Sequence, residues 1–209
     1  MGNVSHVKSK TFAAVSADTT AICANQTNSG SGSMTLTDTG AAGVLVPGNL
    51  GTTITIISTT GTTNSGITFD VTGMGIDGSS VTESAITGPA GSATVTGSTV
   101  FVSVTSITHS GTCTDVSCGI TATTTGTGVV FAGRTRIRGM HVVPSGTEGL
   151  IDFKNGSSRG TKTLEVGVYT DQTPVDPYIP DNGVLFKDGA MINLGATDLA
   201  DNVTVFYDG

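Results

Sequence analysis

The sequence predicts an all-β protein made of two β-sandwich modules, and its composition, residue alternation and turn spacing all point to that fold class. Gly accounts for 30 of the 209 residues, charged residues make up 12%, and Trp is absent. Thr favours strands because its branched Cβ suits a pleated, half-buried surface, whereas the long helix formers Glu, Lys, Gln and Arg are scarce. No window shows a convincing helical period, so we expect the chain to be mostly β.

The first module is predicted from a period of two over residues 52–124. Ile54 and Ile56 alternate with Thr, a spacing that puts one residue type on each face of a strand. Clusters of Gly, Ser, Asn and Asp interrupt the pattern about every 8 to 14 residues, which is typical of an antiparallel sandwich. The apolar positions of TVFVSVTSITH change phase, which predicts a β-bulge near Thr105 or Ser106. Further expected strands are residues 67–72, 80–87, 99–109 and 117–124.

A second module is predicted after Phe131, because the charged fraction rises there while the strand pattern continues. Seven of the nine cations and ten of the sixteen acids follow residue 130. Within LIDFKNGSSRGTKTLEVGV, Asn155-Gly156 supplies the positive φ that a tight hairpin turn requires. The chain is thereby divided into residues 31–130 and residues 131–209. The expected strands of the second module are residues 135–143, 149–154, 161–169, 183–187 and 202–207.

The N-terminal segment, residues 1–30, leaves two alternatives open. It has a modest apolar content and leads into a flexible Gly/Ser stretch. It is either the first strand of the sandwich or an arm that pairs with another subunit. The second alternative makes Lys8, Lys10 and Phe12 candidates for a protein interface.

Charge and hydropathy exclude two classes of partner. The formal net charge is −7, and the first 130 residues carry two cations against six acids, whereas nucleic-acid binding draws on clustered Lys and Arg. The apolar runs fall far short of the roughly 20 residues that a membrane-spanning helix needs. Residues 1–20 lack the apolar core of a secretory signal. We therefore expect a chain that folds in the cytosol and binds neither nucleic acid nor membrane.

The three cysteines are an odd number and cannot form a closed disulfide framework. Cys113 and Cys118 flank TDVS, which we interpret as a hairpin turn, so a local bridge is one alternative. Small, reduced, half-buried side chains are the other. Because no His or carboxylate cluster lies near them in the sequence, we expect neither a zinc site nor another cofactor.

Two short motifs are similar to catalytic signatures, but their context favours turns. GMGIDG, residues 73–78, matches the dinucleotide-binding pattern, yet SSVTESAIT follows where a helix would have to begin. GSSRG, residues 156–160, would make Ser158 a nucleophile, but a strand follows it and His141 lies upstream. We therefore expect no enzymatic activity.

The clearest candidate site is the stretch GRTRIRGMHV. The chain contains no Lys or Arg between Lys10 and Arg134. Alternation on a strand predicts two opposite faces, one with Arg134, Arg136 and Arg138, the other with Ile137, Gly139, His141 and Val143. The three arginines are either a solvated sheet face or a contact with an acidic protein surface.

The order of these motifs resembles that of structural proteins from the virions of tailed bacteriophages. SGITFDVTGMGIDGSSVTESAITGPAG, followed by FVSVTSITHSG and CGITATTTG, is similar to their Ig-like β-sandwich modules. The second half, from GRTRIRGMHVVPSGTEGLIDFKNGSS through NGVLFKDG to NVTVFYDG, is similar to their small jelly-roll-like modules. Together the two likenesses cover most of the chain after residue 30.

The resemblance implies a capsid decoration, or cement, protein that binds the outside of the major capsid shell. It further implies a homo-oligomer, with a trimer as the leading expectation, that assembles in the host cytoplasm and remains in the virion. The alternatives are a tail or fibre-attachment component and a carbohydrate-binding β-sandwich adhesin. Aromatic residues make up only 5% of the chain, which counts against the adhesin because sugar rings usually pack on aromatic side chains.

Overall fold

A computed structural model describes residues 7–37, 43–123, 126–171, 173–180, 182–195 and 199–209. Over these residues the chain is nearly all β and its strands pair in antiparallel sheets, which confirms the predicted all-β class. The elements in chain order are β1 (Lys8–Ala13), β2 (Asp18–Asn28), β3 (Gly32–Ser33), β4 (Val44–Leu45), the 3-10 helix η1 (Pro47–Asn49), β5 (Thr52–Ser58), β6 (Thr68–Gly75), β7 (Ser80–Thr87), β8 (Thr94–His109), β9 (Cys113–Ile120), β10 (Gly126–Phe131), β11 (Thr135–Pro144), β12 (Gly149–Asn155), β13 (Lys162–Val168), β14 (Val184–Phe186), β15 (Ala190–Leu194) and β16 (Ala200–Asp208).

The chain forms two compact units, each assembled from separate segments. Unit 1 comprises Met1–Val15, Pro47–Leu50 and Thr124–Gly209, and unit 2 comprises Ser16–Val46 and Gly51–Thr123. The sequence suggests consecutive modules instead, with boundaries after residues 30 and 130. The difference arises because the N-terminal segment is shared: β1 belongs to unit 1 and β2 to unit 2. Alternation identifies a strand, but it does not identify the strand's distant partner.

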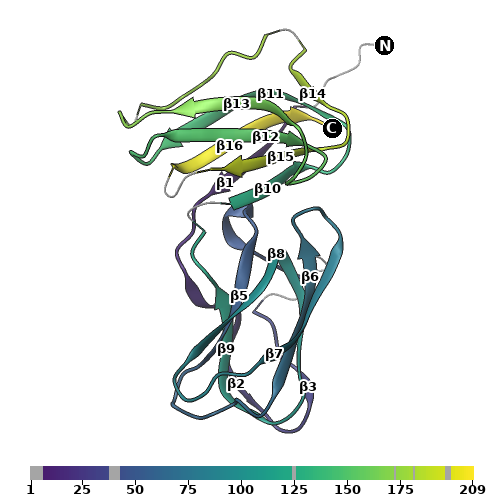
Figure 1. The fold of residues 1–209 in the computed structure, drawn as a ribbon, viewed down its shortest axis with the longest axis vertical. Helices are drawn as coiled ribbons and strands as arrows, with labels where there is room; N and C mark the ends of the chain where they lie inside the picture. The colour runs from purple at the N-terminus through teal and green to yellow at the C-terminus, as the bar shows by residue number, and fades with distance from the viewer. Residues whose placement is uncertain (1–6, 38–42, 124–125, 172, 181, 196–198) are drawn as a thin grey trace. The chain divides into compact units, whose positions relative to one another are not determined.

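Unit 1 consists of two four-stranded sheets, with the orders β1-β16-β11-β14 and β10-β15-β12-β13 (Figure 1). Their strands bury alternate residues. In β16, for example, Val203 and Val205 are fully buried, whereas Phe206 is 39% exposed. Buried residues of both sheets, among them Val203 of β16 and Phe153 of β12, belong to one hydrophobic cluster. Each sheet therefore packs one face on a shared core, as in a β-sandwich.

The strand β1 completes the edge of the first sheet of unit 1. It pairs along its whole length with β16, and Phe12 lies opposite Val203 in this register. Phe12 is fully buried in the unit 1 cluster. This part of the N-terminal segment is thus a strand of the chain's own sandwich, and it pairs with the last strand of the chain.

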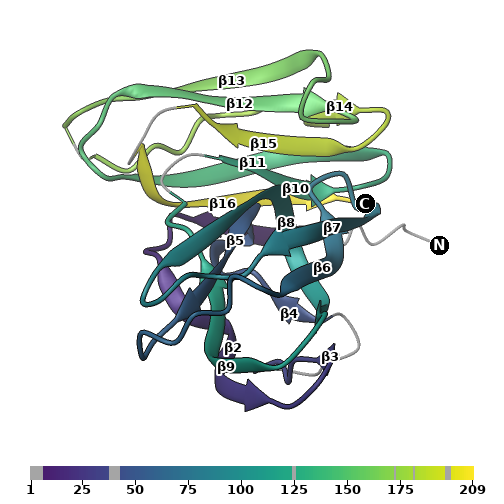
Figure 2. The same cartoon turned by 60° about the horizontal axis from the view of Figure 1, so that its bottom comes forward.

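Unit 2 is organised around β8, a strand of 16 residues. One part of β8 pairs with β5 and a later part with β6, which gives the sheet order β2-β9-β5-β8-β6-β7 (Figure 2). Thr72 pairs with Ser106 and Gly73 pairs with Val104, so Thr105 is an extra residue between two consecutive pairs. The β-bulge predicted near Thr105 or Ser106 is therefore confirmed.

The interpretation of TDVS as a hairpin turn is wrong. These residues lie inside the continuous strand β9, which pairs with β2 on one side and β5 on the other. Asp115 has a φ of 51° and accompanies a register irregularity, not a chain reversal. Cys113 and Cys118 are therefore separated by roughly 16 Å of strand, too far for a disulfide. All three cysteines are free and buried.

Candidate functional site

The arginine strip, defined as Arg134, Arg136 and Arg138, begins one residue before β11 and continues on the outer face of the sheet β1-β16-β11-β14. Arg134 is exposed, and the other two arginines are half-buried. Thr135 and Ile137, which alternate with them, are buried. The three arginines therefore share one side of the strand, as the sequence predicts.

Arg138 is the extra residue of a β-bulge. Ile137 pairs with Tyr207, and the next pair joins Gly139 to Phe206. A bulge of this kind reverses the inside–outside alternation of every later residue in the strand. The arginine strip therefore ends at the bulge. There the buried positions change from odd-numbered residues to even-numbered residues.

The bulge corrects one part of the sequence prediction. Alternation predicts that His141 and Val143 share the face of Ile137, opposite the arginines. Beyond the bulge the buried residues are instead Met140 and Val142, while His141 and Val143 are only half-buried. His141 thus lies on the same outer face as the arginines.

His141 has a partner that the sequence did not indicate. Its Nδ1 lies 2.8 Å from Asp176 Oδ1. The two side chains are 41% and 67% exposed, so the pair is solvated and is not enclosed in a water-excluding cleft. Ser158, the other candidate in the G-x-S-x-G motif, lies in the turn between β12 and β13.

The three arginines differ in their immediate neighbours. An Arg136 Nη1–H donates to the Gly183 carbonyl oxygen at 3.3 Å. Arg138 Nε lies 3.6 Å from Asp208 Oδ2. Arg134 forms neither a hydrogen bond nor an ion pair with any other residue that the structure describes. Its guanidinium therefore keeps its full capacity to bind an external anion.

A pocket opens at the strip, with a volume of about 240 Å³. Two arginines contribute to its wall, and Asp208 is the acidic side chain among the lining residues. The two guanidinium groups outnumber the one carboxylate among the lining side chains, so the pocket attracts anionic groups. The lining residues are Arg134, Thr135, Arg136, Leu185, Asp208 and Gly209.

Sequence reasoning missed Asp208 and Leu185, which line the same pocket. A signal for Asp208 was present in NVTVFYD, because alternation places Thr204, Phe206 and Asp208 on one face. Only the pairing of β16 with β11 shows that this face carries the arginines, since Arg136 lies opposite Asp208.

The remaining interface candidates, Lys8, Lys10 and Phe12, alternate along β1, where Lys8 is exposed, Lys10 is half-buried and Phe12 is buried. The Lys8 Nζ donates to the Gly209 carbonyl oxygen at 2.7 Å, and the Lys10 Nζ donates to the Val129 carbonyl oxygen at 2.8 Å. Burial lowers the pKa of Lys10. Phe12 is fully buried, so its side chain is not available to a partner. Phe12 is therefore excluded from any contact surface, whereas the exposed Lys8 bonds to Gly209, which lines the same pocket as Arg134 and Arg136.

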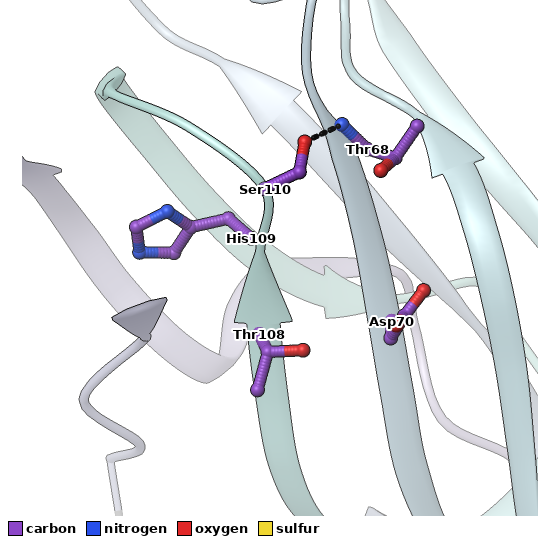
Figure 3. Close-up of a pocket in the computed structure, with 5 residues that line it drawn as sticks. All are labelled: Thr68, Asp70, Thr108, His109 and Ser110. Atoms are coloured by element: carbon purple, nitrogen blue, oxygen red, sulfur yellow. Dashed lines mark hydrogen bonds between the residues drawn. The ribbon is translucent and has the colours of Figure 1, made fainter. Parts of the chain in front are cut away.

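A second pocket, of about 160 Å³, lies at the end of β8 in unit 2 and is lined by Thr68, Asp70, Thr108, His109 and Ser110. Figure 3 shows the His109 ring turned away from Asp70, and the hydrogen bond drawn there runs from Thr68 N to Ser110 Oγ.

Both ionisable side chains of this second pocket form hydrogen bonds with backbone groups. Asp70 Oδ1 accepts a 2.7 Å hydrogen bond from Ala85 N, a residue with a φ of 60°. His109 Nδ1 lies 2.7 Å from the Gly111 carbonyl oxygen. An acid–base pair would have to converge on a substrate position, and these two groups diverge. We therefore assign both side chains a structural role in the sheet.

The turn interpretation is confirmed for GSSRG and for the second half of GMGIDG, whose first three residues are part of β6. In GMGIDG, Gly78 has a φ of 80°, and its N–H donates to the Gly75 carbonyl oxygen at 3.0 Å. In GSSRG, Gly156 has a φ of 81°, and Asn155 N donates to the Thr161 carbonyl oxygen at 3.0 Å. Both motifs connect paired antiparallel strands.

The described residues contain neither a metal-ligand cluster nor a membrane-spanning helix. In that part of the chain, no group of three or more His, Cys, Asp or Glu side chains is arranged to hold a metal ion. No helix in the same residues is long and apolar enough to span a bilayer.

The fold and this surface define an all-β protein with a cationic strip on the outer face of one sheet. Comparisons of the chain with protein-family models, curated proteins and solved structures find no match.

Proposed function

We propose that the protein is a structural component of a tailed-phage virion, a decoration protein that binds the outside of the major capsid shell. The arginine strip is the observation that carries the proposal. It is an outward-facing cationic strip on a chain whose net charge is −7. The resemblance of the two halves to Ig-like and jelly-roll-like virion modules supplies the biological setting.

The chemistry of the strip favours a protein partner with exposed carboxylates. A guanidinium presents a planar fork of donors that matches a carboxylate, and it remains charged at all physiological pH values. A β-strand fixes the spacing of such donors, so less conformational entropy is lost on docking than from a flexible tail. The acidic side of the contact would be a surface of the capsid shell.

The charge distribution also supports self-association of the protein. Unit 2 contains no Lys or Arg and carries several acids, so it offers a second copy the acidic surface that the strip requires. The homo-oligomer implied by the resemblance, a trimer in the leading expectation, is consistent with such a contact. Assembly would take place in the host cytoplasm.

The proposal is tested by binding the purified protein to preformed capsid shells that lack it. The variant Arg134→Glu/Arg136→Glu should reduce occupancy on the shells at least tenfold, because it replaces attraction by repulsion at the contact. Occupancy of the natural sequence should also fall as ionic strength rises. Cosedimentation and cryo-microscopy measure both effects.

A matched control lies on the other sheet of unit 1. Arg159 is exposed in the β12–β13 turn, and Lys154 donates to the Ser158 carbonyl oxygen at 3.0 Å, much as Arg136 donates to Gly183. Lys154→Glu/Arg159→Glu changes the net charge by the same amount and should leave occupancy unchanged. Equal binding by both double variants would remove the strip from the interface. Location of the chain in the tail of purified particles would favour the tail or fibre-attachment alternative.

One observation favours a second candidate function, carbohydrate binding. Tyr169 and Tyr178 are 67% and 88% exposed, and both lie between β13 and β14. Exposed aromatic rings are the side chains on which sugars pack. Selective binding on a glycan array that is lost in Tyr178→Ala would support this function in place of the first.

A further inference from the structure

The three cysteines of unit 2 are arranged unequally. Cys23 of β2 lies directly opposite Cys118 of β9 in the antiparallel register, whereas Cys113 lies opposite Asn28. Directly opposite residues of antiparallel strands have Cα atoms about 4.5 to 5.5 Å apart, which falls within the range that a disulfide spans. The backbone therefore already brings one pair of thiols together.

The surroundings of this pair are apolar and rich in sulfur. Cys23 and Cys118 are both fully buried, and Met34 is 5% exposed. The Sγ of Cys118 lies 3.6 Å from the Sδ of Met34. Among the described residues, these thiols belong to no group of three or more side chains that could hold a metal ion.

We propose that Cys23 and Cys118 are an oxidation site, at which a peroxide converts the two thiols into a disulfide that links β2 to β9. Cys113 remains reduced. This disulfide does not depend on the function proposed above.

The two thiols have different roles in this reaction. A hydrogen bond from Cys118 lowers the pKa of Cys23, and the same interaction, together with burial, raises the pKa of Cys118. Cys23 therefore provides the thiolate, which is the nucleophilic form of a cysteine. Cys118 is the resolving thiol.

The reaction proceeds in two balanced steps. The Cys23 thiolate attacks one oxygen of hydrogen peroxide, so that an S–O bond forms, the O–O bond breaks and hydroxide leaves with the proton that Cys23 had lost, as water. The sulfur of Cys118 then attacks the resulting sulfenic acid; the S–S bond forms, the S–O bond breaks, and the hydroxyl leaves with the Cys118 proton as a second water. The two thiols lose the two electrons that the peroxide gains.

Access of the small oxidant is provided by the place of β2 in the sheet. β2 is the terminal strand of the order β2-β9-β5-β8-β6-β7, and its pairing with β9 is interrupted between each of its successive pairs. On its other side, Thr37 N donates to the Ile22 carbonyl oxygen at 3.0 Å, so peroxide would enter through the irregular pairing with β9. Irregularly paired edge strands open locally more often than central strands. Brief separation near Cys23 would admit peroxide without unfolding the unit.

The test treats the native full-length protein with hydrogen peroxide, removes the peroxide with catalase, and alkylates the remaining thiols after denaturation. Trypsin is unsuitable because residues 11–134 form one peptide that contains all three cysteines. Cleavage before Asp instead separates them into peptides 18–37, 77–114 and 115–151. We expect peptides 18–37 and 115–151 to become linked, with alkylatable thiols falling from three to one.

Variants and a second readout make the result decisive. Cys113→Ser should still form the link, and Cys23→Ser should not. The oxidised protein should unfold at a higher denaturant concentration, and a reductant should reverse the shift. Three intact thiols after treatment, a link to peptide 77–114, or sulfoxide at Met34 without any link would each overturn the proposal.

Discussion

Arg138 Nε lies 3.6 Å from Asp208 Oδ2, so the bulged residue of β11 forms an ion pair with the final residue of β16. The two side chains are 30% and 29% exposed. The bulge and this ion pair both involve Arg138. Before it Ile137 is buried, and after it Met140 is buried. As a result, one arginine of the strip is partly neutralised within the chain, and Arg134 and Arg136 are left for an external anion.

The Arg138–Asp208 pair should contribute little to stability. A double-mutant cycle with Arg138→Gln and Asp208→Asn is expected to give a coupling energy below about 1 kcal/mol, because solvent screens a partly exposed ion pair. Urea denaturation followed by tyrosine fluorescence measures it, since all three tyrosines lie in unit 1. A coupling of several kcal/mol would show that the pair holds the bulge in place.

Glu83 joins β7 to β8 by accepting hydrogen bonds from consecutive backbone N–H groups. Its Oε1 accepts from Ser98 N at 2.6 Å, and its Oε2 accepts from Thr99 N at 3.0 Å. The variant Glu83→Gln replaces one acceptor by a donor that faces an N–H. We expect a loss of about 1 kcal/mol in the free energy of unfolding of unit 2.

The same carboxylate should make stability depend on pH. Burial opposes ionisation of Glu83, but the hydrogen bonds from Ser98 and Thr99 outweigh it and lower its pKa below the ordinary value of 4.5. A carboxyl group with a lowered folded-state pKa stabilises the fold above its ordinary pKa, and the contribution is lost as pH falls through the folded-state value. The difference between the natural protein and Glu83→Gln, measured by urea denaturation with circular dichroism, should therefore shrink below pH 4.5. A difference that stays constant down to about pH 3 would contradict this assignment.

Local sequence patterns predicted the strands and one bulge, but not the long-range pairing. The phase change around Thr105 is visible because Val104 and Ile107 fit opposite alternations. The phase of TRIRGMHVV is ambiguous, since both Val142 and Val143 are apolar, and only burial in the folded sheet decides between them. The partner of β1 is the last strand of the chain, and no local pattern carries that information.

For the candidate site, the sequence predicted the cationic face but not the residues from other strands that contact it. Three arginines at alternate positions indicated a cationic face, because alternation is a property of a single strand. The partners that modify this face, Asp208 and Gly183, belong to other strands or turns. Their proximity follows from the sheet order and could not be deduced from spacing along the sequence.

Gly73, the first glycine of GMGIDG, is required by close backbone packing. A Cβ at this position would collide with the Ser103 carbonyl oxygen and lie 3.0 Å from the Phe101 ring. Gly73→Ala should therefore destabilise unit 2 by about 1 to 3 kcal/mol, because β8 cannot shift without losing ladder hydrogen bonds. All three cysteines lie in unit 2, so their alkylation rate against denaturant concentration reports its unfolding.

A control for Gly73 is available in the preceding turn. A Cβ at Gly66 would meet nothing within 4 Å, and Gly66→Ala should change the free energy of unfolding by no more than about 0.5 kcal/mol. Equal effects of the two substitutions would mean that loss of glycine flexibility, and not the contact with Ser103, controls stability.

Phe12 provides the strongest test that the N-terminal segment belongs to unit 1. Its ring is fully buried in the cluster that contains residues of both sheets. Phe12→Ala should reduce the free energy of unfolding of unit 1 by about 3 to 5 kcal/mol through lost burial and the cavity left behind. Tyrosine fluorescence follows this transition, while cysteine alkylation follows unit 2 separately. The matched substitution Phe206→Ala, at a ring that is 39% exposed on the neighbouring strand, should cost much less because solvent already reaches that ring. If Phe12→Ala left the tyrosine transition unchanged, β1 would not be a strand of this sandwich in solution, and the arm that pairs with another subunit would become the better description of the segment.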